Sequence, residues 1–172
     1  ESLEGDIAAV DKALGGAISQ LIKQGEIKGK LNEITLVHSL GKLPAERVVV
    51  TGLGKQQDLT TDKVRGAVAE TCRWLRSKGV DTIATIAQGA GINGISIDTA
   101  SQTVTEGALL GLYSFRKYIT KKDNERGEIK YLLIAANDKT KVLLEHGATR
   151  GEVLAEAANL ARDLVNEPGN FM

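Results

Sequence analysis

Side chains able to carry nucleophilic, acid-base or metal chemistry are scarce in this sequence. The 172 residues include one cysteine, Cys72, and two histidines, His38 and His146. A zinc site needs three or four ligands at characteristic spacing, and the sequence contains no such group. Cys72 lies on a predicted cationic helix beside Arg73, which could favour a thiolate. Because no histidine lies nearby in the sequence to act as its base, we interpret Cys72 as an ordinary helix cysteine near the core boundary.

The two histidines also have structural interpretations. His38 shares a face of a predicted strand with Ile34 and Leu36, which places it at the edge of the core. His146 falls near the end of a predicted helix, where a protonated imidazole suits the helix dipole. Carboxylates are plentiful, but no spacing singles out a catalytic pair. We therefore assign no catalytic residue and no metal ligand.

A glycine-rich stretch after a predicted strand matches the sequence pattern of a nucleotide-binding fingerprint. Residues Gly89–Gly94 fit the pattern GxGxxG, which in dinucleotide-binding folds opens a helix whose first amides meet a pyrophosphate. Here Ile95 and Ile97 follow the loop. The region about 20 residues further on is the helical segment Gly111–Phe115, with no acid at a strand end. We interpret the glycines as a flexible connection.

The densest local charge lies between Phe115 and Tyr131, where six basic residues outnumber three acids. The six are Arg116, Lys117, Lys121, Lys122, Arg126 and Lys130. With Tyr118 and Tyr131 interleaved, this segment could lie along a phosphate backbone as a nucleic-acid contact. A solvated loop is the simpler interpretation, because a net of three charges is common on neutral proteins.

Apolar periodicity predicts alternating helices and strands, which is typical of an α/β fold. Helices are predicted over 6–22, with an interruption at Gly15 and Gly16, and over 62–78, 98–118, 138–146 and from before Val153 to Asn166. Short strands are predicted over 33–39, 47–51, 81–87 and 131–136. The last is apolar throughout, as expected for a strand covered on both faces. The pattern predicts helices on both faces of a largely parallel or mixed sheet.

Length and composition exclude several classes of protein. The chain has 22 basic and 22 acidic residues, so its bulk field attracts neither nucleic acid nor anionic membrane. One domain fits 172 residues. No apolar run approaches the roughly 18–20 residues that span a bilayer, and a single cysteine suits a reducing compartment, so we expect a cytoplasmic protein without membrane contact. Residue 1 is Glu rather than Met, from which we expect a processed product or a piece of a longer protein.

Four parts of the sequence, read in order, resemble a known family. They are Asp11–Gly16 with Gly25–Lys30, Val48–Gly54, Glu106–Tyr118 and Gly151–Asn170. Their order and spacing are similar to the N-terminal domain of the leucyl aminopeptidase (cytosol aminopeptidase) family, over nearly the whole chain. The most diagnostic parts are the stretch EGALLGLYSFRKY and the closing ARDLVNEPGN.

The resemblance implies a macro-domain-like fold, a three-layer α/β/α sandwich with a mixed sheet and helices on both faces. It implies that residues 1–166 form a non-catalytic N-terminal domain and that 167–172 begin the connection to a C-terminal catalytic domain. In the family, that catalytic domain removes N-terminal amino acids from peptides with two divalent metal ions, Zn or Mn, held by Asp, Glu and Lys ligands. The family's ligand segments are absent here, so no cofactor site is carried over and we do not expect this chain to be active alone.

The resemblance and the residues leave three roles open. The leading one is packing against the catalytic domain of the same enzyme and supporting its oligomer, for which the family implies a homohexamer. A second is a DNA-binding accessory or regulatory role through residues 115–131. A third is a nucleotide or ADP-ribose pocket, by fold analogy alone. The family's domain usually opens with a β-strand, for which residues 1–5 leave no room, so an uncovered sheet edge would tend to seek a partner.

Overall fold

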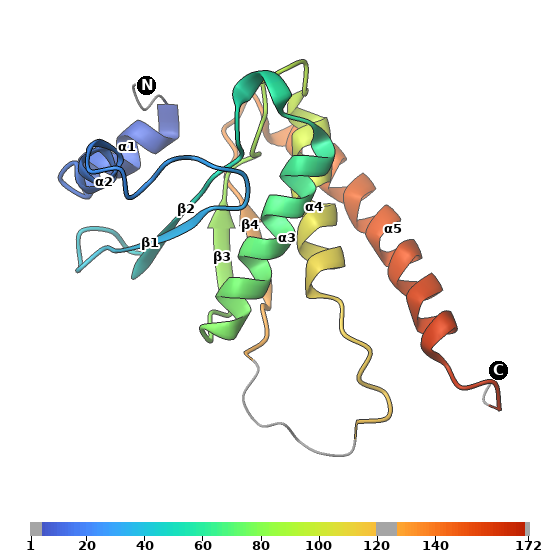
Figure 1. The fold of residues 1–172 in the computed structure, drawn as a ribbon. Coiled ribbons are helices and arrows are strands. Elements are labelled where there is room, and N and C mark those ends of the chain that lie inside the picture. Colours follow the sequence, from blue (N-terminus) through green and yellow to red (C-terminus); the bar gives the residue numbers. More distant parts are fainter. Residues whose placement is uncertain (1–4, 120–126, 171–172) are drawn as a thin grey trace. The chain divides into compact units, whose positions relative to one another are not determined.

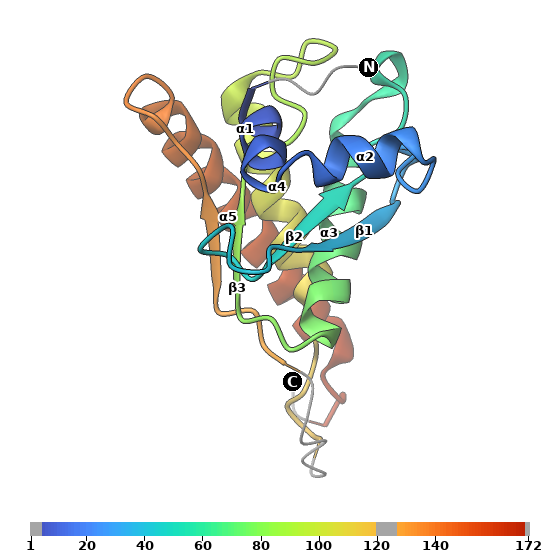
Figure 2. The same ribbon diagram turned by 90° about the vertical axis from the view of Figure 1, so that its left-hand side faces the viewer.

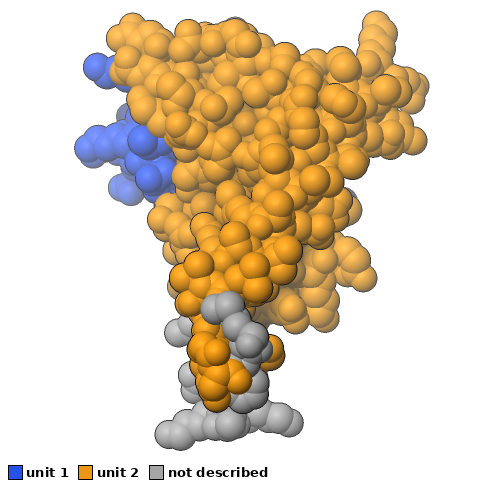
Figure 3. Space-filling view, turned by 90° about the vertical axis from the view of Figure 1, so that its right-hand side faces the viewer, with its two compact units in different colours: residues 1–55 blue, residues 56–172 orange. Residues whose placement is uncertain are grey.

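The computed structural model describes residues 5–119 and 127–170, and the chain forms two compact units (Figure 3). In unit 1, residues 1–55, the elements are α1 (Gly5–Ala13), α2 (Ala17–Lys23), β1 (Ile34–His38) and β2 (Arg47–Thr51). In unit 2, residues 56–172, they are η1 (Gln56–Asp58), α3 (Thr61–Ser77), β3 (Thr82–Thr85), α4 (Ile97–Leu112), β4 (Tyr131–Ile134) and α5 (Lys141–Asn166) (Figure 1). None of the helices so described is long and apolar enough to cross a membrane.

The two helices of unit 1 are separated where the sequence predicts an interruption. Gly15 and Gly16 have φ angles of 74° and 81°, a left-handed conformation that glycine adopts without strain. The Asp11 carboxylate accepts hydrogen bonds from the backbone N–H of Ile18 at 2.8 Å and of Ser19 at 3.1 Å, which satisfies donors in the first turn of α2. The Ser19 hydroxyl, working against burial and together with these amides, lowers the pKa of Asp11.

Strands β1 and β2 fall where the sequence predicts two strands, and they pair antiparallel with Val37 opposite Val48. The buried core of unit 1 consists of Leu14, Ile18, Ile27 and Val37. Successive side chains of a strand point to opposite faces, so the burial of Val37 turns His38 outward. His38 is exposed at the end of β1, and its predicted place at the edge of the core is therefore wrong.

Three helices form the body of unit 2, and α4 packs between α3 and α5 (Figures 1 and 2). Thr60 and Ser96 are the N-caps of α3 and α4, and their side-chain oxygens accept from first-turn amides at 3.3 and 3.4 Å. Helix α4 ends at Leu112 rather than at the predicted Tyr118, because Tyr113 turns to an extended conformation with φ −51° and ψ 135°. The segment after Leu112 is held by α5, as described below.

Helix α5 runs without a break from Lys141 to Asn166, so the prediction of two helices divided near His146 is wrong. Glycine ends many helices, but Gly147 has another use here. A Cβ atom on Gly147 would lie 2.0 Å from the carbonyl oxygen of Asp98 in α4, and a Cβ on Gly151 would lie 2.6 Å from that of Gln102. These two glycines let the backbones of α4 and α5 touch, while the helix continues through them.

Strands β3 and β4 pair in parallel, with Ile83 opposite Leu132, and α4 and α5 lie over one face of β4. Leu132 and Ile134 are half-buried, whereas Tyr131 and Leu133, on the other face, are 63% and 55% exposed. The prediction that residues 131–136 form a strand covered on both faces is therefore wrong for the described structure. The strand alternates between covered and open positions.

The α/β class predicted from the alternating elements is confirmed. Among the described residues, four strands form one antiparallel pair, β1 with β2, and one parallel pair, β3 with β4. The strand directions are thus mixed, as predicted. The division into two separate pairs was not visible in the sequence.

The contact between α4 and α5 yields the first prediction. Gly147→Ala should lower the free energy of unfolding by about 2 kcal/mol, because the added Cβ meets backbone of α4 that cannot rotate away. The matched control is Gly66→Ala in α3, where a Cβ meets nothing within 4 Å. That change should raise the free energy of unfolding by about 0.5–1 kcal/mol. Urea unfolding followed by circular dichroism measures both, and effects of the same sign would contradict the close approach.

Candidate functional site

The two segments most diagnostic of the family resemblance meet in unit 2, where the segment after α4 is hydrogen-bonded to the last turns of α5. The Tyr113 hydroxyl donates to Oδ1 of Asp163 at 2.8 Å and accepts from Nδ2 of Asn166 at 3.2 Å. The Arg162 guanidinium lies 5.3 Å from the centre of the Tyr113 ring, within the range of a cation–π contact. Three residues of the closing motif therefore bind one tyrosine of the other.

A second group of contacts fixes the end of α5. Nζ of Lys117 donates to Oε1 of Glu167 at 2.7 Å, and the Tyr118 hydroxyl donates to the same oxygen. The Glu167 side chain is only 12% exposed, so most water is excluded from it. We call these residues the C-terminal clasp: Tyr113, Lys117, Tyr118, Arg162, Asp163, Asn166 and Glu167.

The clasp keeps the Glu167 carboxylate ionised and the phenols of Tyr113 and Tyr118 neutral. Hydrogen bonds from Lys117 and then from Tyr118 lower the pKa of Glu167. Burial, followed by the Asp163 acceptor, raises the pKa of Tyr113, and the Glu167 acceptor raises the pKa of Tyr118. The phenols thus serve as hydrogen-bond donors at neutral pH. The geometry supports a structural role for the clasp, since each of its side chains has a hydrogen-bond partner within the protein.

Two arginines, Arg162 of the clasp and Arg76 of α3, bind the last carbonyl oxygens of α4. Nη1 of Arg162 donates to the carbonyl oxygen of Leu110 at 3.1 Å, and Nη1 of Arg76 donates to that of Leu112 at 2.9 Å. The last carbonyls of a helix have no partner inside it, and positive charge is favourable at this end of the helix dipole. Arg162 therefore supports both the Tyr113 ring and the helix end.

Another pair of motif residues, Glu106 and Gly107, joins α4 to α3. Glu106 accepts from Nε of Arg65 at 2.7 Å and from Nε2 of Gln102 at 2.6 Å, with a side chain that is 7% exposed. A Cβ on Gly107 would lie 2.7 Å from the carbonyl oxygen of Arg65. Both motif residues are thus required by the packing of α3 on α4.

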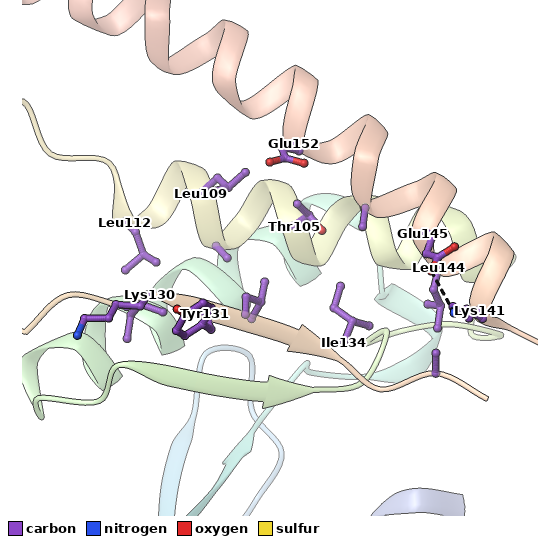
Figure 4. Close-up of a pocket in the computed structure, with 15 residues that line it drawn as sticks. Thr105, Leu109, Leu112, Lys130, Tyr131, Ile134, Lys141, Leu144, Glu145 and Glu152 are labelled. Carbon is purple, nitrogen blue, oxygen red and sulfur yellow. Dashed lines mark ion pairs between the residues drawn. The ribbon is translucent and has the colours of Figure 1, made fainter. Parts of the chain in front are cut away.

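A cavity of about 550 Å³ lies between α4, α5 and β4. Figure 4 shows Thr105 and Leu109 of α4 on one side and Tyr131 and Ile134 of β4 on the other. Its lining is mainly apolar. Four charged residues also border it: Lys130, Lys141, Glu145 and Glu152. No histidine or cysteine lines this cavity, so its lining offers no nucleophile and none of the soft ligands that bind zinc.

The predicted nucleic-acid residues fall into two groups. Lys121, Lys122 and Arg126 lie outside the described residues. Arg116 and Lys130 are exposed, and Lys117 is neutralised by Glu167. A nucleic-acid contact by this segment stays a prediction, and so does a nucleotide or ADP-ribose pocket.

The glycine loop is explained by local contacts. Nδ2 of Asn93 donates to the carbonyl oxygen of Leu59 at 2.9 Å, and α4 begins only at Ile97, past the last glycine of the loop, with Ser96 as its N-cap. The helix amides are thus served by a side chain of the protein itself. This placement agrees with the interpretation of Gly89–Gly94 as a connection.

The remaining candidates for chemistry lie apart from one another. Cys72 is 2% exposed in α3, and burial raises its pKa to about 11 against the opposing effect of Arg73, so the thiol is protonated at neutral pH. His146 lies near the N-terminal end of α5, whereas the sequence predicted it near the C-terminal end of a helix. Within residues 5–119 and 127–170, no three side chains of His, Cys, Asp or Glu are grouped so as to hold a metal ion. The described residues therefore do not fit the dimetal site that the family implies.

Comparison with known proteins defines the class first. The fold is similar to that of a tomato leucine aminopeptidase variant, with a TM-score of 0.71 at 19% identity, over 96% of this chain and 32% of that one. It is also similar to the bottromycin maturation enzyme BotP in complex with Mn, with a TM-score of 0.68 at 24% identity, over 87% of this chain and 29% of that one. The chain thus has the α/β fold found in part of these larger proteins.

Sequence comparison gives the family. The family described as "Cytosol aminopeptidase family, N-terminal domain" matches residues 1–122. A probable cytosol aminopeptidase of Alkaliphilus metalliredigens is 38% identical over 165 residues, which are 95% of this chain and 33% of that protein. The chain belongs to the cytosol aminopeptidase family, as its N-terminal domain, and spans about a third of the length of the curated relatives it matches.

Sequence reasoning recognised the motif segments but missed the clasp. Lys117 and Glu167 are 50 residues apart, and Tyr113 and Asp163 are separated by the same distance. The available signal was the joint presence of both motifs, which indicates a shared structural task. It does not indicate which residues touch.

The Arg65–Glu106 pair gives a second prediction. Glu106→Ala should lower the free energy of unfolding by about 2 kcal/mol, less than the roughly 3–5 kcal/mol typical of a fully buried pair, because Arg65 is 30% exposed. The control is Glu70→Ala, which removes the exposed Glu70–Arg73 pair of α3 and should cost about 0.5 kcal/mol or less. Equilibrium urea unfolding compares the two. Equal losses would show that Glu106 acts only as a surface charge.

The clasp gives a third prediction, on pH. Because the pKa of Glu167 is lowered in the folded chain, its stabilising effect is present above its unfolded value of about 4.5 and is lost as pH falls through the folded value. Glu167→Gln should therefore melt several degrees below the parent chain at pH 7, and the difference should shrink as the pH falls below about 4.5. Glu156→Gln, which removes an exposed acid of helix α5, is the control. A difference that persists unchanged at pH 3 would contradict the ionised clasp.

Proposed function

We propose that this domain has a non-catalytic role: it packs against the catalytic domain of its own enzyme through the outer face of α5 and supports assembly of the oligomer. The observation that carries this proposal is an exposed apolar stripe on α5. Its members are Val142, Val153, Leu160 and Leu164, which are 73%, 61%, 61% and 54% exposed.

The stripe lies opposite the face that α4 covers. The buried residues of α5 are Leu144, Gly147, Gly151 and Ala155. At about 100° per residue, the four stripe residues project roughly 180° away from these. A surface helix of a globular protein has one apolar face, and a helix that is apolar on opposite sides is typical of a buried position between two partners. In the described structure α4 supplies one partner, and the other side is open.

The clasp supports the position of this second partner. It ties Glu167, the residue after the last turn of α5, to the segment that follows α4. We propose that residues 1–166 form the domain and that 167–172 begin the connection to the catalytic domain. The clasp would then set the direction in which the chain leaves the helix, and the α5 stripe would lie beside the residues that follow.

The chemistry of the whole enzyme is proposed from its relatives. The curated relatives are called probable cytosol aminopeptidases, and BotP was solved in complex with Mn. We propose that the full-length protein removes N-terminal amino acids from peptides in the cytoplasm, with two divalent ions of Zn or Mn held outside this chain. A homohexamer is the assembly we propose for it.

A fourth prediction separates the catalytic from the packing role. The purified chain, given Mn²⁺ or Zn²⁺ and a peptide with N-terminal leucine, should release no free leucine above a metal-only blank. The same preparation should unfold cooperatively in urea, which shows that inactivity is not misfolding. Measurable turnover that scales with chain concentration would overturn the non-catalytic role.

The packing role is tested by measuring how the chain associates with a catalytic-domain partner. The chain is co-expressed with the remaining two thirds of the Alkaliphilus metalliredigens relative, and association is measured by size-exclusion chromatography. Val153→Asp and Leu160→Asp should each weaken association about tenfold or more, since each removes an apolar side chain from a buried contact. Leu154→Asp makes the same change at an exposed leucine roughly 100° around the helix from the stripe and should leave association unchanged. Association that survives both stripe substitutions would exclude this face.

A further inference from the structure

The starting observation is the free edge of β4. In this strand the backbone N–H groups of Lys130 and Tyr131 donate to the carbonyl oxygen of Asp81 at 2.7 and 3.2 Å, and the N–H of Ala135 donates to Thr85 at 2.8 Å. Backbone groups of a strand alternate between its two edges, so those of Leu132 and Ile134 point away from β3. Within the described residues β3 is the one strand paired with β4.

This edge lacks charge, proline and a bulge, three of the features by which proteins protect an exposed strand. Natural edges are blunted by charged side chains, proline or bulges. Residues Tyr131–Ile134 read Tyr-Leu-Leu-Ile, with no charge and no proline, and the register with β3 is regular over all four positions. An unprotected apolar edge is a ready template for another strand.

The cavity described above adjoins the free edge. It is lined by β4, α4 and α5, and no residue of β3 borders it, so it lies on the side of β4 away from β3 (Figure 4). Leu132 and Ile134 form its floor, and Leu109, Leu112 and Leu144 are among the residues that cover it. A strand added at this edge would therefore have space and apolar surroundings for every second side chain.

The charges around the cavity are balanced, which defines the chemistry of the occupant. Two lysines, Lys130 and Lys141, and two glutamates, Glu145 and Glu152, border it. Nζ of Lys141 lies 3.8 Å from Oε1 of Glu145, so this pair is already matched. A charged occupant would gain no net partner and would lose its hydration, so an uncharged segment is favoured.

We propose that the free edge of β4 takes up an extended, uncharged peptide strand, which pairs with the backbone of Leu132 and Ile134 and places alternate apolar side chains in the cavity. The N–H and C=O groups of Leu132 and Ile134 form two donors and two acceptors along the edge. A polypeptide has donors and acceptors at the matching spacing, whereas a lipid or a small apolar molecule lacks them. This is strand addition, in which main-chain hydrogen bonds give affinity and side-chain pockets give specificity. A second copy of this chain fits less well, because its own β4 side chains on that face are already covered by its own α4 and α5.

The fifth prediction tests this with residue-resolved amide hydrogen exchange on the chain of 172 residues. Alone, the amides of Leu132 and Ile134 should exchange much faster than that of Leu133, which faces β3. Addition of a capped hexapeptide of alternating threonine and valine should slow the exchange of Leu132 and Ile134 at least tenfold. The same peptide with an N-methyl group at every residue keeps its side chains but loses its backbone donors, and it should give no protection.

Matched variants test the cavity. Ala148→Glu places a charge in the cavity lining and should abolish protection by the peptide. Thr149→Glu adds the same charge at the neighbouring exposed position and should leave protection intact. Slow exchange of Leu132 and Ile134 without peptide, or no change at millimolar peptide, would overturn the proposal. So would equal protection by the N-methylated peptide, or protection that rises with chain concentration alone, which would identify a second copy as the occupant.

Discussion

Direct backbone contact between α4 and α5 is the constraint on which unit 2 depends. At Gly147 and Gly151 there is no room for a Cβ atom between α5 and the carbonyl oxygens of α4. The buried Ser101 hydroxyl of α4 donates to the carbonyl oxygen of Leu144 at 2.7 Å across the same contact. A contact made by backbone leaves little freedom to slide or rotate, because a shift by one residue brings a side chain into the gap. It therefore fixes which residues of α5 face inward and, by helical geometry, which face outward.

The clasp depends on that contact. With α4 and α5 held in register, the segment after α4 passes the last turns of α5 at hydrogen-bond distance, and Tyr113 reaches Asp163 and Asn166. Several residues of the two motif segments in unit 2, Glu106–Tyr118 and Gly151–Asn170, have packing or hydrogen-bonding roles there. This part of the family resemblance thus reflects how α3, α4 and α5 are assembled.

The sequence predicted the elements well where periodicity was the only signal. Helix α3 and the β1–β2 hairpin fall where apolar spacing placed them, because local propensity and tertiary packing agree there. The prediction of helix boundaries failed where glycine has two different roles. Gly15 and Gly16 end a helix, whereas Gly147 lies inside one, and only the carbonyl oxygen of Asp98 opposite Gly147 distinguishes the two cases. The clasp was not predictable, because its ion pair joins residues 50 positions apart and no local pattern specifies such a pair.

The two open surfaces of unit 2 differ in what they require of a partner. The α5 stripe offers side chains alone, since the backbone of a helix is satisfied internally, so any complementary apolar surface can cover it. The free edge of β4 offers unpaired backbone groups, and only another extended backbone can satisfy them in sequence. A domain with few reactive side chains thus exposes two surfaces with distinct chemical requirements. The helix face suits a large preformed surface such as a neighbouring domain, and the strand edge suits a segment that becomes ordered as it binds.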